Sequence, residues 1–160
     1  MVLAEELENV AFLRQFTPTH QRKIAGLARL KEYLPDDVIF AEGDHCPEVY
    51  LVLDGEVGLE IRVPTCGLVE VLRVGPGELL GWSPVMGGGP MTATAISATR
   101  CRLAALGADE VVALADRDPR FGLEFFHCMS AALAERLHAT RLQIPDSARD
   151  RFRGLAEGAD

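Results

Sequence analysis

Apolar residues in the first part of the chain recur with the spacing of helices. Between Leu3 and Phe16 they stand three or four positions apart, a period close to 3.6 that predicts an amphipathic helix over residues 3–16. Thr17 is suited to cap a further helix and Pro18 to occupy its first turn, so a second helix is predicted over residues 18–30.

After Glu32 the pattern changes to short apolar runs that are rich in β-branched side chains. Turn-forming Gly, Pro and Asp residues separate these runs at the intervals that are typical of sandwiches and rolls. The predicted strands cover residues 38–40, 49–53, 57–63, 68–74, 92–97 and 101–106. Together they predict a closed antiparallel β-structure.

The helical pattern returns after Gly107, with predicted helices over residues 109–116 and 119–144 that are broken at Asp118-Pro119. The predicted fold class is therefore mainly β with flanking helices. It is an antiparallel β-roll, similar to a jelly roll, with N-terminal helices and a long C-terminal helix. Residues 1–144 are expected to form one domain, and residues 145–160 a flexible tail that has little to pack against.

Composition narrows the possible functions. With 160 residues, of which 48% are hydrophobic, the chain can build one core without metal or disulfide support. Its formal net charge of -8 opposes the phosphate neutralisation on which nucleic-acid binding depends, so no direct DNA binding is expected. The N-terminus is acidic where a signal peptide needs cations, and no apolar run has the length of a membrane span. We therefore expect a cytoplasmic protein without a membrane partner.

The residues that most often carry metal or catalytic chemistry are scattered. Cys46, Cys66, Cys101 and Cys128 form no C-x-x-C pair, and they are expected to be buried free thiols rather than metal ligands or disulfides. Three of the four histidines fall in predicted helices and His45 in a turn, which predicts no metal triad. Motifs of nucleophilic or metal-dependent hydrolases are absent, so the chain is not expected to be an enzyme.

Two neighbouring segments carry a family resemblance. Residues 38–44 combine a strand with a Glu-Gly-Asp turn, and residues 50–57 combine a Tyr-x-Val strand with an Asp-Gly hairpin. Gly43 and Gly55 are suited to these corners because glycine adopts positive φ without a clash. At this spacing the motifs resemble the first half of cyclic-nucleotide-binding domains. The resemblance implies a β-roll with a ligand pocket, flanked by helices that move when the pocket fills.

Residues 75–81 resemble the approach to the phosphate-binding cassette of that family. The family cassette continues with Gly-Glu-x-Ala, a short helix and Pro-Arg, in which the Glu binds the ribose and the Arg binds the cyclic phosphate. Here Trp82 stands in place of the Glu and Met91 in place of the Arg. The resemblance therefore implies a cassette without its two charged anchors, and we expect cyclic nucleotides to bind very weakly. No resident cofactor is predicted.

The resemblance places the ligand pocket at Gly81, Trp82, Ser83, Met91 and Thr92. Ser83, followed by a proline, is expected to cap a short helix whose N-terminus faces the pocket, and Thr92 offers a hydroxyl. Trp82 is either a stacking surface for a flat ligand or a filler of the space that a nucleotide would occupy, and we favour the filler. Met91 is interpreted as a packing residue.

The predicted last helix carries an apolar stripe at the a/d spacing of a coiled coil. The stripe consists of Leu123, Phe126, Ser130, Leu133, Leu137, Thr140 and Ile144. Residues 133–140 resemble the dimerising helix of catabolite-activator-type regulators, which implies a parallel homodimer through residues 119–144 with Thr140 near the ligand. In the alternative interpretation the stripe packs on the β-roll, as the off-stripe Phe121 and Phe125 are expected to do.

Two functions are compatible with these features. The first is a small-molecule sensor whose C-terminal helices change their angle on binding. The second is a ligand-free dimerisation or protein-interaction scaffold of the same fold. A cavity retained among Trp82, Ser83, Met91 and Thr92 would support the sensor, whereas a cavity filled by Trp82 would support the scaffold. The winged helix of the regulators has no counterpart in the short segment after Ile144, so the resemblance covers the sensor and not a DNA reader.

Overall fold

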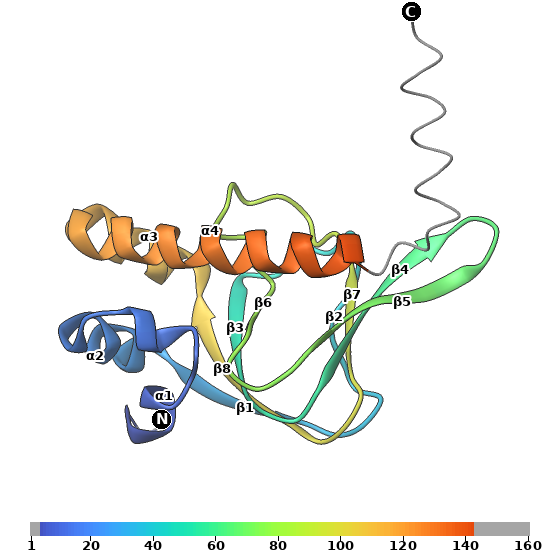
Figure 1. Ribbon diagram of the computed structural model, residues 1–160, viewed down its shortest axis with the longest axis horizontal. Coiled ribbons are helices and arrows are strands. Elements are labelled where there is room, and N and C mark those ends of the chain that lie inside the picture. Colours follow the sequence, from blue (N-terminus) through green and yellow to red (C-terminus); the bar gives the residue numbers. More distant parts are fainter. Residues whose placement is uncertain (1–3, 143–160) are drawn as a thin grey trace, which may run out of the picture.

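In the computed structural model, which describes residues 4–142, two β-sheets are joined to helices from both ends of the chain (Figure 1). The helices are α1 (Ala4–Glu8), the 3-10 helix η1 (Leu13–Gln15), α2 (Pro18–Leu27), α3 (Ala108–Arg117) and α4 (Pro119–Leu142). The strands are β1 (Arg29–Tyr33), β2 (Val38–Phe40), β3 (Glu48–Asp54), β4 (Val57–Val63), β5 (Gly67–Val74), β6 (Leu79–Leu80), β7 (Thr94–Ser97) and β8 (Cys101–Gly107).

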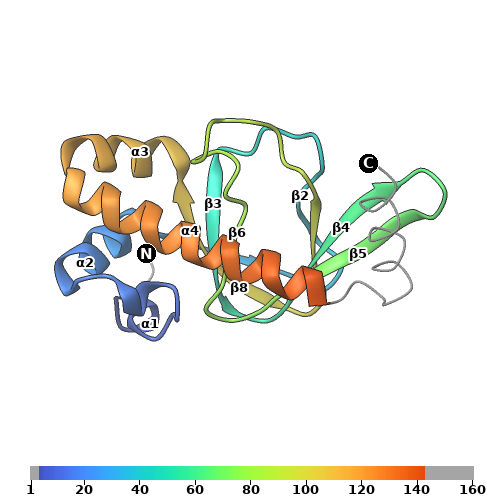
Figure 2. The ribbon, with the colours of Figure 1, turned by 45° about the horizontal axis from the view of Figure 1, so that its top comes forward.

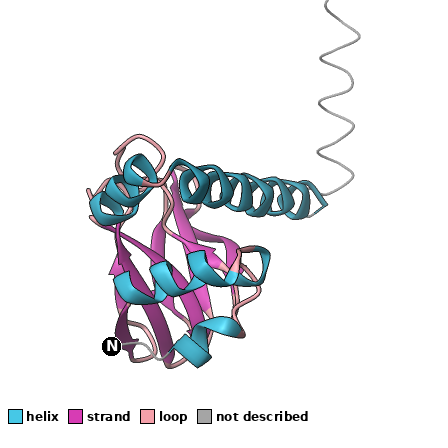
Figure 3. Ribbon diagram, turned by 90° about the vertical axis from the view of Figure 1, so that its left-hand side faces the viewer, coloured by secondary structure: helices cyan, strands magenta, loops and turns pink. Residues whose placement is uncertain are grey.

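The strands form two four-stranded antiparallel sheets, with the orders β1-β8-β3-β6 and β2-β7-β4-β5. The predicted fold class is thereby confirmed. The β4–β5 hairpin extends beyond the rest of the roll, and α4 runs from the helical end of the molecule across the strands toward that hairpin (Figure 2). Seen from the helical end, helices lie in front of the strands and along the upper end of the roll (Figure 3).

Alternating side chains of the central strands divide the core into two clusters. In β3, Val49 and Leu51 belong to the cluster that contains the helices, whereas Tyr50 and Val52 point into the roll. This alternation follows from the two-residue period of a strand. The central sheet therefore separates a helical cluster from a roll cluster, and both clusters are buried.

The single helix predicted over residues 3–16 is wrong, because α1 ends at Glu8 and the chain turns before η1. On one continuous helix Leu7 and Phe16, nine residues apart at about 100° each, would point to opposite sides. The turn buries both of them, at 2% and 4% exposure. It is held at Phe12, whose backbone N–H donates to the Gly77 carbonyl at 3.1 Å.

The second helix was expected to reach Leu30, but it ends at Leu27. Ala28 is already extended, and Arg29–Tyr33 pairs with β8 as an additional strand that the sequence pattern did not predict. Strand β6, of two residues, was also missed, and β7 begins at Thr94 rather than at Thr92. Helix α4 agrees with its prediction as far as Leu142; residues 143 and 144 and the predicted tail 145–160 lie outside the described residues.

The cysteines are only partly as expected. Cys101 and Cys128 are buried free thiols, but Cys46 is half-buried and Cys66 is exposed in the turn between β4 and β5. Cys66 was misjudged because the hairpin that carries it leaves the core. No group of metal-ligating side chains occurs among residues 4–142. A search of the same residues for a helix of membrane-spanning length and hydropathy found none.

Candidate functional site

The corner that opens the site requires a glycine. The chain leaves β6 at Gly81 with φ of 74°, in the left-handed region. A Cβ at this position would lie 3.2 Å from Cε1 of Phe40 and 3.3 Å from Cε of Met91. Gly81 therefore lets β6 turn directly over the roll cluster and brings Trp82 and Ser83 to the same place as Met91.

The structure brings together the predicted pocket residues of the roll. They line one cavity of about 20 Å³, whose walls are Phe40, Leu59, Gly81, Trp82, Ser83, Met91, Thr92 and Ala93. A volume of this size holds about one water molecule. Ligand pockets in proteins usually measure about 300–1,000 Å³. The cavity in this structure is therefore smaller than an ordinary ligand pocket.

The walls of the cavity carry no charged side chain. Met91 is 3% exposed and belongs to the roll cluster, where its thioether fills space beside Phe40. Thr92 is exposed at the rim. The strong hydrogen bonds to phosphate are charge-assisted, and the polar side chains in these walls are the uncharged hydroxyls of Ser83 and Thr92.

The helix expected to begin at Ser83 is not formed. Residues 83–87 make turns in which the N–H groups of Val85 and Met86 donate to the Trp82 carbonyl, and that of Gly88 to the Ser83 carbonyl. Three glycines in a row, residues 87–89, end this segment, and glycine has low helix propensity, so the turns do not continue as a helix. The anion site that a helix N-terminus would supply is therefore missing.

The Glu-Gly-Asp turn of residues 42–44 is hydrogen-bonded to residues 91–94 at this site. The Gly43 N–H donates to the Met91 carbonyl, and the Met91 N–H donates to the Asp44 carbonyl, both at 2.8 Å. The Glu42 N–H donates to the Thr94 hydroxyl at 2.9 Å. The Glu-Gly-Asp turn thus fixes the far wall of the cavity. Gly43 and Gly55 have φ of 87° and 86°, as their turns predicted.

One residue of the site was missed from the sequence. Arg136 of α4 places its Cζ 5.1 Å from the centroid of the Trp82 ring, and its Nη2 donates to the Leu79 carbonyl at 2.5 Å. Burial lowers the pKa of Arg136, against a smaller opposing effect of the Glu78 carboxylate. Arg136 follows Met129 and Ala132 on the side of α4 that faces the sheets, and an Arg on an apolar helix face was the available signal.

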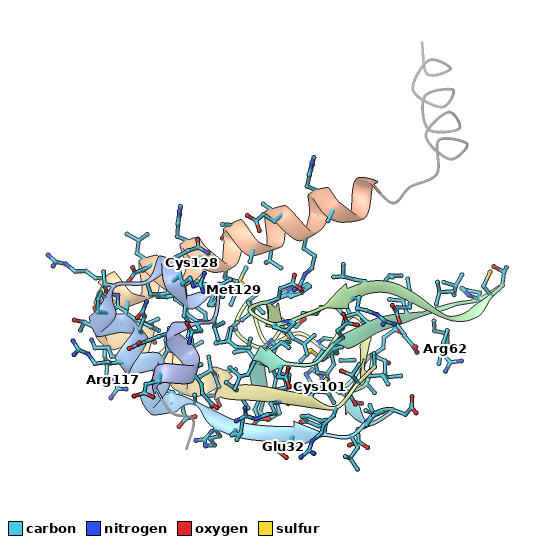
Figure 4. All side chains as sticks on the ribbon, turned by 60° about the horizontal axis from the view of Figure 1, so that its bottom comes forward. Glu32, Arg62, Cys101, Arg117, Cys128 and Met129 are labelled. Carbon is cyan, nitrogen blue, oxygen red and sulfur yellow. The ribbon has the colours of Figure 1, made fainter. Side chains whose placement is uncertain are left out.

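Helix α4 divides its predicted seam between solvent and core. Leu123 and Leu137 are 76% and 57% exposed, and Ser130 between them is also exposed. Phe126 and Leu133 are partly buried against the helical cluster. Phe121 and Phe125 are fully buried, as expected. Figure 4 shows Cys128 and Met129 on the half of α4 that lies over the N-terminal helices. Thr140 lies in α4, but its side chain is outside the described part of the structure.

A polar cluster fastens the beginning of α4 to α2. His20 lies between the carboxylates of Asp118 and Glu124, and Lys23 pairs with Asp118. The bond from Lys23, together with the backbone N–H of Phe121, lowers the pKa of Asp118 to about 2. The arrangement joins elements, and no nucleophile or metal is part of it.

Comparison with known proteins gives a consistent result. The model of the cyclic nucleotide-binding domain family matches residues 30–118. The cyclic AMP receptor protein of Thermus thermophilus is 34% identical over 107 residues, which are 66% of this chain and 47% of that protein. A cAMP-dependent protein kinase regulatory subunit of Hypocrea atroviridis is 30% identical over 101 residues, 63% of this chain and 21% of that protein. The chain therefore spans half or less of each relative.

Solved structures agree on the fold. A cyclic nucleotide-binding domain from Methylobacillus flagellatus has a TM-score of 0.81 at 21% identity, with 88% of this chain and 82% of that chain covered. The catabolite activator protein of Thermus thermophilus has a TM-score of 0.70 at 26% identity, with 83% and 61% covered. In both comparisons the similarity extends over most of the described residues.

Proposed function

This chain belongs to the cyclic nucleotide-binding domain family, and we propose that it is a regulatory sensor domain whose altered cassette signals through α4. The observation that carries the proposal is the cavity of about 20 Å³ at the position that corresponds to the family's ligand site, which Trp82 borders and no charged side chain lines. The position is kept, while the anchors for a cyclic phosphate are not. The domain would therefore respond to a ligand other than the ordinary cyclic nucleotides, or to them only at high concentration.

The proposed signal path runs from Trp82 to α4. Trp82 lines the cavity, and its ring also contacts the guanidinium of Arg136 in α4. A ligand that needs more room than one water molecule has to displace the indole. Displacement of the indole removes a contact of α4, so the helix changes its position or its freedom to move. Ligand binding and helix movement would then be coupled in the sense of a population shift.

We further propose that the protein is a homodimer through α4. Support comes from the line of exposed residues Leu123, Ser130 and Leu137, which are seven positions apart and share one side of the helix. Exposed leucines at this spacing are typical of a helix that pairs with a second copy. Thr140 would approach the ligand from the same helix, as the family resemblance implies.

The remaining features of the proposal concern the setting of the domain. We expect no enzymatic activity, a cytoplasmic location and no direct binding of nucleic acid by this chain, whose formal net charge is -8. Residues 1–144 are proposed as one functional unit, with residues 145–160 as its tail. Output would then pass to a partner protein or to a further segment rather than to DNA directly.

A second candidate function is a ligand-free scaffold of the same fold. The observation that favours it is the small size of the cavity beside Trp82, about 20 Å³. In a scaffold the indole would be a permanent part of the core, and α4 would serve dimerisation alone.

A thermal-shift screen separates the two candidates. Cyclic nucleotides, cyclic dinucleotides and apolar metabolites are added to the wild-type protein, and the unfolding temperature is recorded. A ligand at about 100 times its Kd adds roughly 2.7 kcal/mol, which raises Tm by roughly 5–11 °C for a chain of this size. A compound that does so supports the sensor. A flat response to the whole panel would contradict it and favour the scaffold.

A further inference from the structure

We infer that Arg136 is a positioning residue of the ligand site: it holds the Trp82 indole over the cassette cavity and so keeps the cavity closed. The inference rests on the proposed function, since it names the device that regulates the same site. The side chain of Arg136 connects the second half of α4 to the corner that follows β6.

The first support is the place of Arg136 on the helix. The residues of α4 that face the sheets run through Phe125, Met129 and Ala132, all of which belong to or pack against the helical cluster. Arg136 continues this side of the helix but carries a charge. Because a buried guanidinium loses hydration, an apolar side chain at this position would be the cheaper choice for stability alone. Its presence therefore points to a role beyond packing.

The second support comes from two contacts of Arg136 at the corner. Its guanidinium lies over the Trp82 ring at 5.1 Å, within the range of a cation–π interaction, and its Nη2 donates to the Leu79 carbonyl. Leu79 and Trp82 stand on either side of Leu80 and Gly81, at the start of the cassette. One side chain thus holds both ends of the corner, and it fixes the indole relative to the strand.

The third support is the different size of the two spaces that the contacting side chains border. Trp82 lines the cavity of about 20 Å³, and Arg136 borders a groove of about 610 Å³ between α4 and the β5–β6 segment. The groove has room for the indole and for the movement of α4. If the cation–π contact with Arg136 is lost, the indole is free to leave the cassette. The contact of Arg136 with Trp82 therefore keeps the volume of the cavity at about that of one water molecule, and loss of the contact allows a larger volume.

The test uses the fluorescence of the 160-residue chain, in which Trp82 is the only tryptophan. Acrylamide quenching of this single fluorophore measures how often the indole is exposed, and it needs no ligand. Loss of the cation–π contact in Arg136→Gln is expected to raise the exposed population roughly 2- to 30-fold, which increases the quenching constant and shifts the emission to the red. Arg136→Lys, which keeps the charge but not the planar donor, is expected to fall between wild type and Arg136→Gln.

The matched control is Arg73→Gln, because Arg73 borders the same groove but pairs with Glu70 and Glu56 instead of Trp82. The control undergoes the same chemical change, and its quenching should equal that of wild type. Quenching of Arg136→Gln at the wild-type level, or an equal rise in Arg73→Gln, would overturn the inference. If Arg136→Gln loses the far-UV circular dichroism of the folded protein, Arg136→Lys decides the matter: a rise supports the inference, and a wild-type value overturns it.

The outcome is independent of the proposed function. If no compound in the thermal-shift screen binds, the sensor proposal is contradicted. The quenching data would still report whether Arg136 positions Trp82. Conversely, a ligand can bind in the screen while the quenching of Trp82 is the same in Arg136→Gln as in wild type. That result would support the sensor proposal and contradict the positioning role of Arg136.

Discussion

The two halves of α4 are attached to the molecule in different ways. In the first half Phe121 and Phe125 are fully buried, and Phe125 contacts the rings of Phe12 and Phe16 with centroids 6.1 Å apart in each case. In the second half, from Ser130 onward, most side chains are exposed or half-buried, and Arg136 makes the contact with the cassette. One half is part of the core, and the other rests on it.

The different attachment of the two halves of α4 indicates which half can move when a ligand binds. Full burial of a phenylalanine contributes about 1.5–3 kcal/mol, and several such residues act together in the first half. A cation–π contact contributes about 0.5–2 kcal/mol. Ligand binding can supply the smaller amount easily, but not the larger one. We therefore expect the first half to act as a fixed hinge and the second half, with Arg136, to be the part that moves.

The largest effect is expected where the weakly attached half meets the cassette. Trp82→Glu with Met91→Arg removes the closing indole and restores both charged anchors of the family. Hydrogen bonds to charged groups contribute roughly 1.5–3 kcal/mol each, so cyclic AMP affinity should rise by about two to four decades over wild type. Calorimetry measures this gain.

The single variant Trp82→Glu is the control for that experiment, because it opens the cavity without supplying a cation. It should bind cyclic AMP no better than wild type does. An equal gain in the single variant would show that space alone limits binding.

The firmly attached half is tested by Phe125→Ala. Removal of a fully buried phenylalanine costs about 3–5 kcal/mol, which corresponds to a fall in Tm of roughly 6–20 °C. Leu123→Ala, at a position 76% exposed on the same half, should stay within about 0.5 kcal/mol of wild type. Thermal unfolding followed by circular dichroism compares the two. Similar losses in both variants would contradict the division of α4 into a buried and a free side.

The exposed side of α4 is tested by Leu137→Glu, which places a carboxylate in the proposed dimer seam. The desolvation of that carboxylate should weaken association by about 1–3 kcal/mol, roughly 5- to 160-fold in the dimer Kd. Analytical ultracentrifugation at micromolar concentration follows the change. His138→Glu, an exposed position off the stripe, should sediment as wild type does. A monomeric wild-type protein under these conditions would end the dimer proposal.

The smallest effect concerns the polar cluster at the hinge. The pKa of Asp118, lowered to about 2 from its ordinary 3.8, means that its charged form favours the folded state. This contribution is complete above about pH 4 and is lost as the pH falls toward 2. Wild-type Tm should therefore fall more steeply between pH 4 and pH 2 than that of Asp118→Asn. Asp116→Asn, at an exposed position on α3, should follow wild type, and a wild-type slope in Asp118→Asn would contradict the assignment.

Most of the strands can be predicted from the residue pattern, and the strands that were not predicted have physical reasons. Strands β2 to β5 follow from alternation and turn residues, and Gly43 and Gly55 take the positive φ that their turns demand. Strand β1 was missed because its residues, Arg29–Tyr33, pair with the distant β8 and carry no apolar alternation of their own. Tertiary pairing decided its structure.

Gly81, Trp82, Ser83, Met91 and Thr92 line one cavity, but their number and identity do not determine the volume that they enclose. That volume depends on where the indole of Trp82 points, and Arg136, 54 positions later in the chain, influences its direction. The turn at residues 83–87 replaced an expected helix because the glycines that follow do not support one. The contact between Arg136 and Trp82 is long-range and lies beyond local sequence patterns, whereas the glycines beside the turn are visible in the sequence.

The most direct test of the account is a calorimetric titration of the wild-type protein with cyclic AMP. The closed cavity and the missing anchors predict no binding heat above dilution with cyclic AMP at up to about 1 mM, the concentration at which a Kd corresponds to about 4.1 kcal/mol. A Kd in the micromolar range or below would contradict the account, since a site with Trp82 and Met91 in place of its charged anchors would then hold the phosphate by other means.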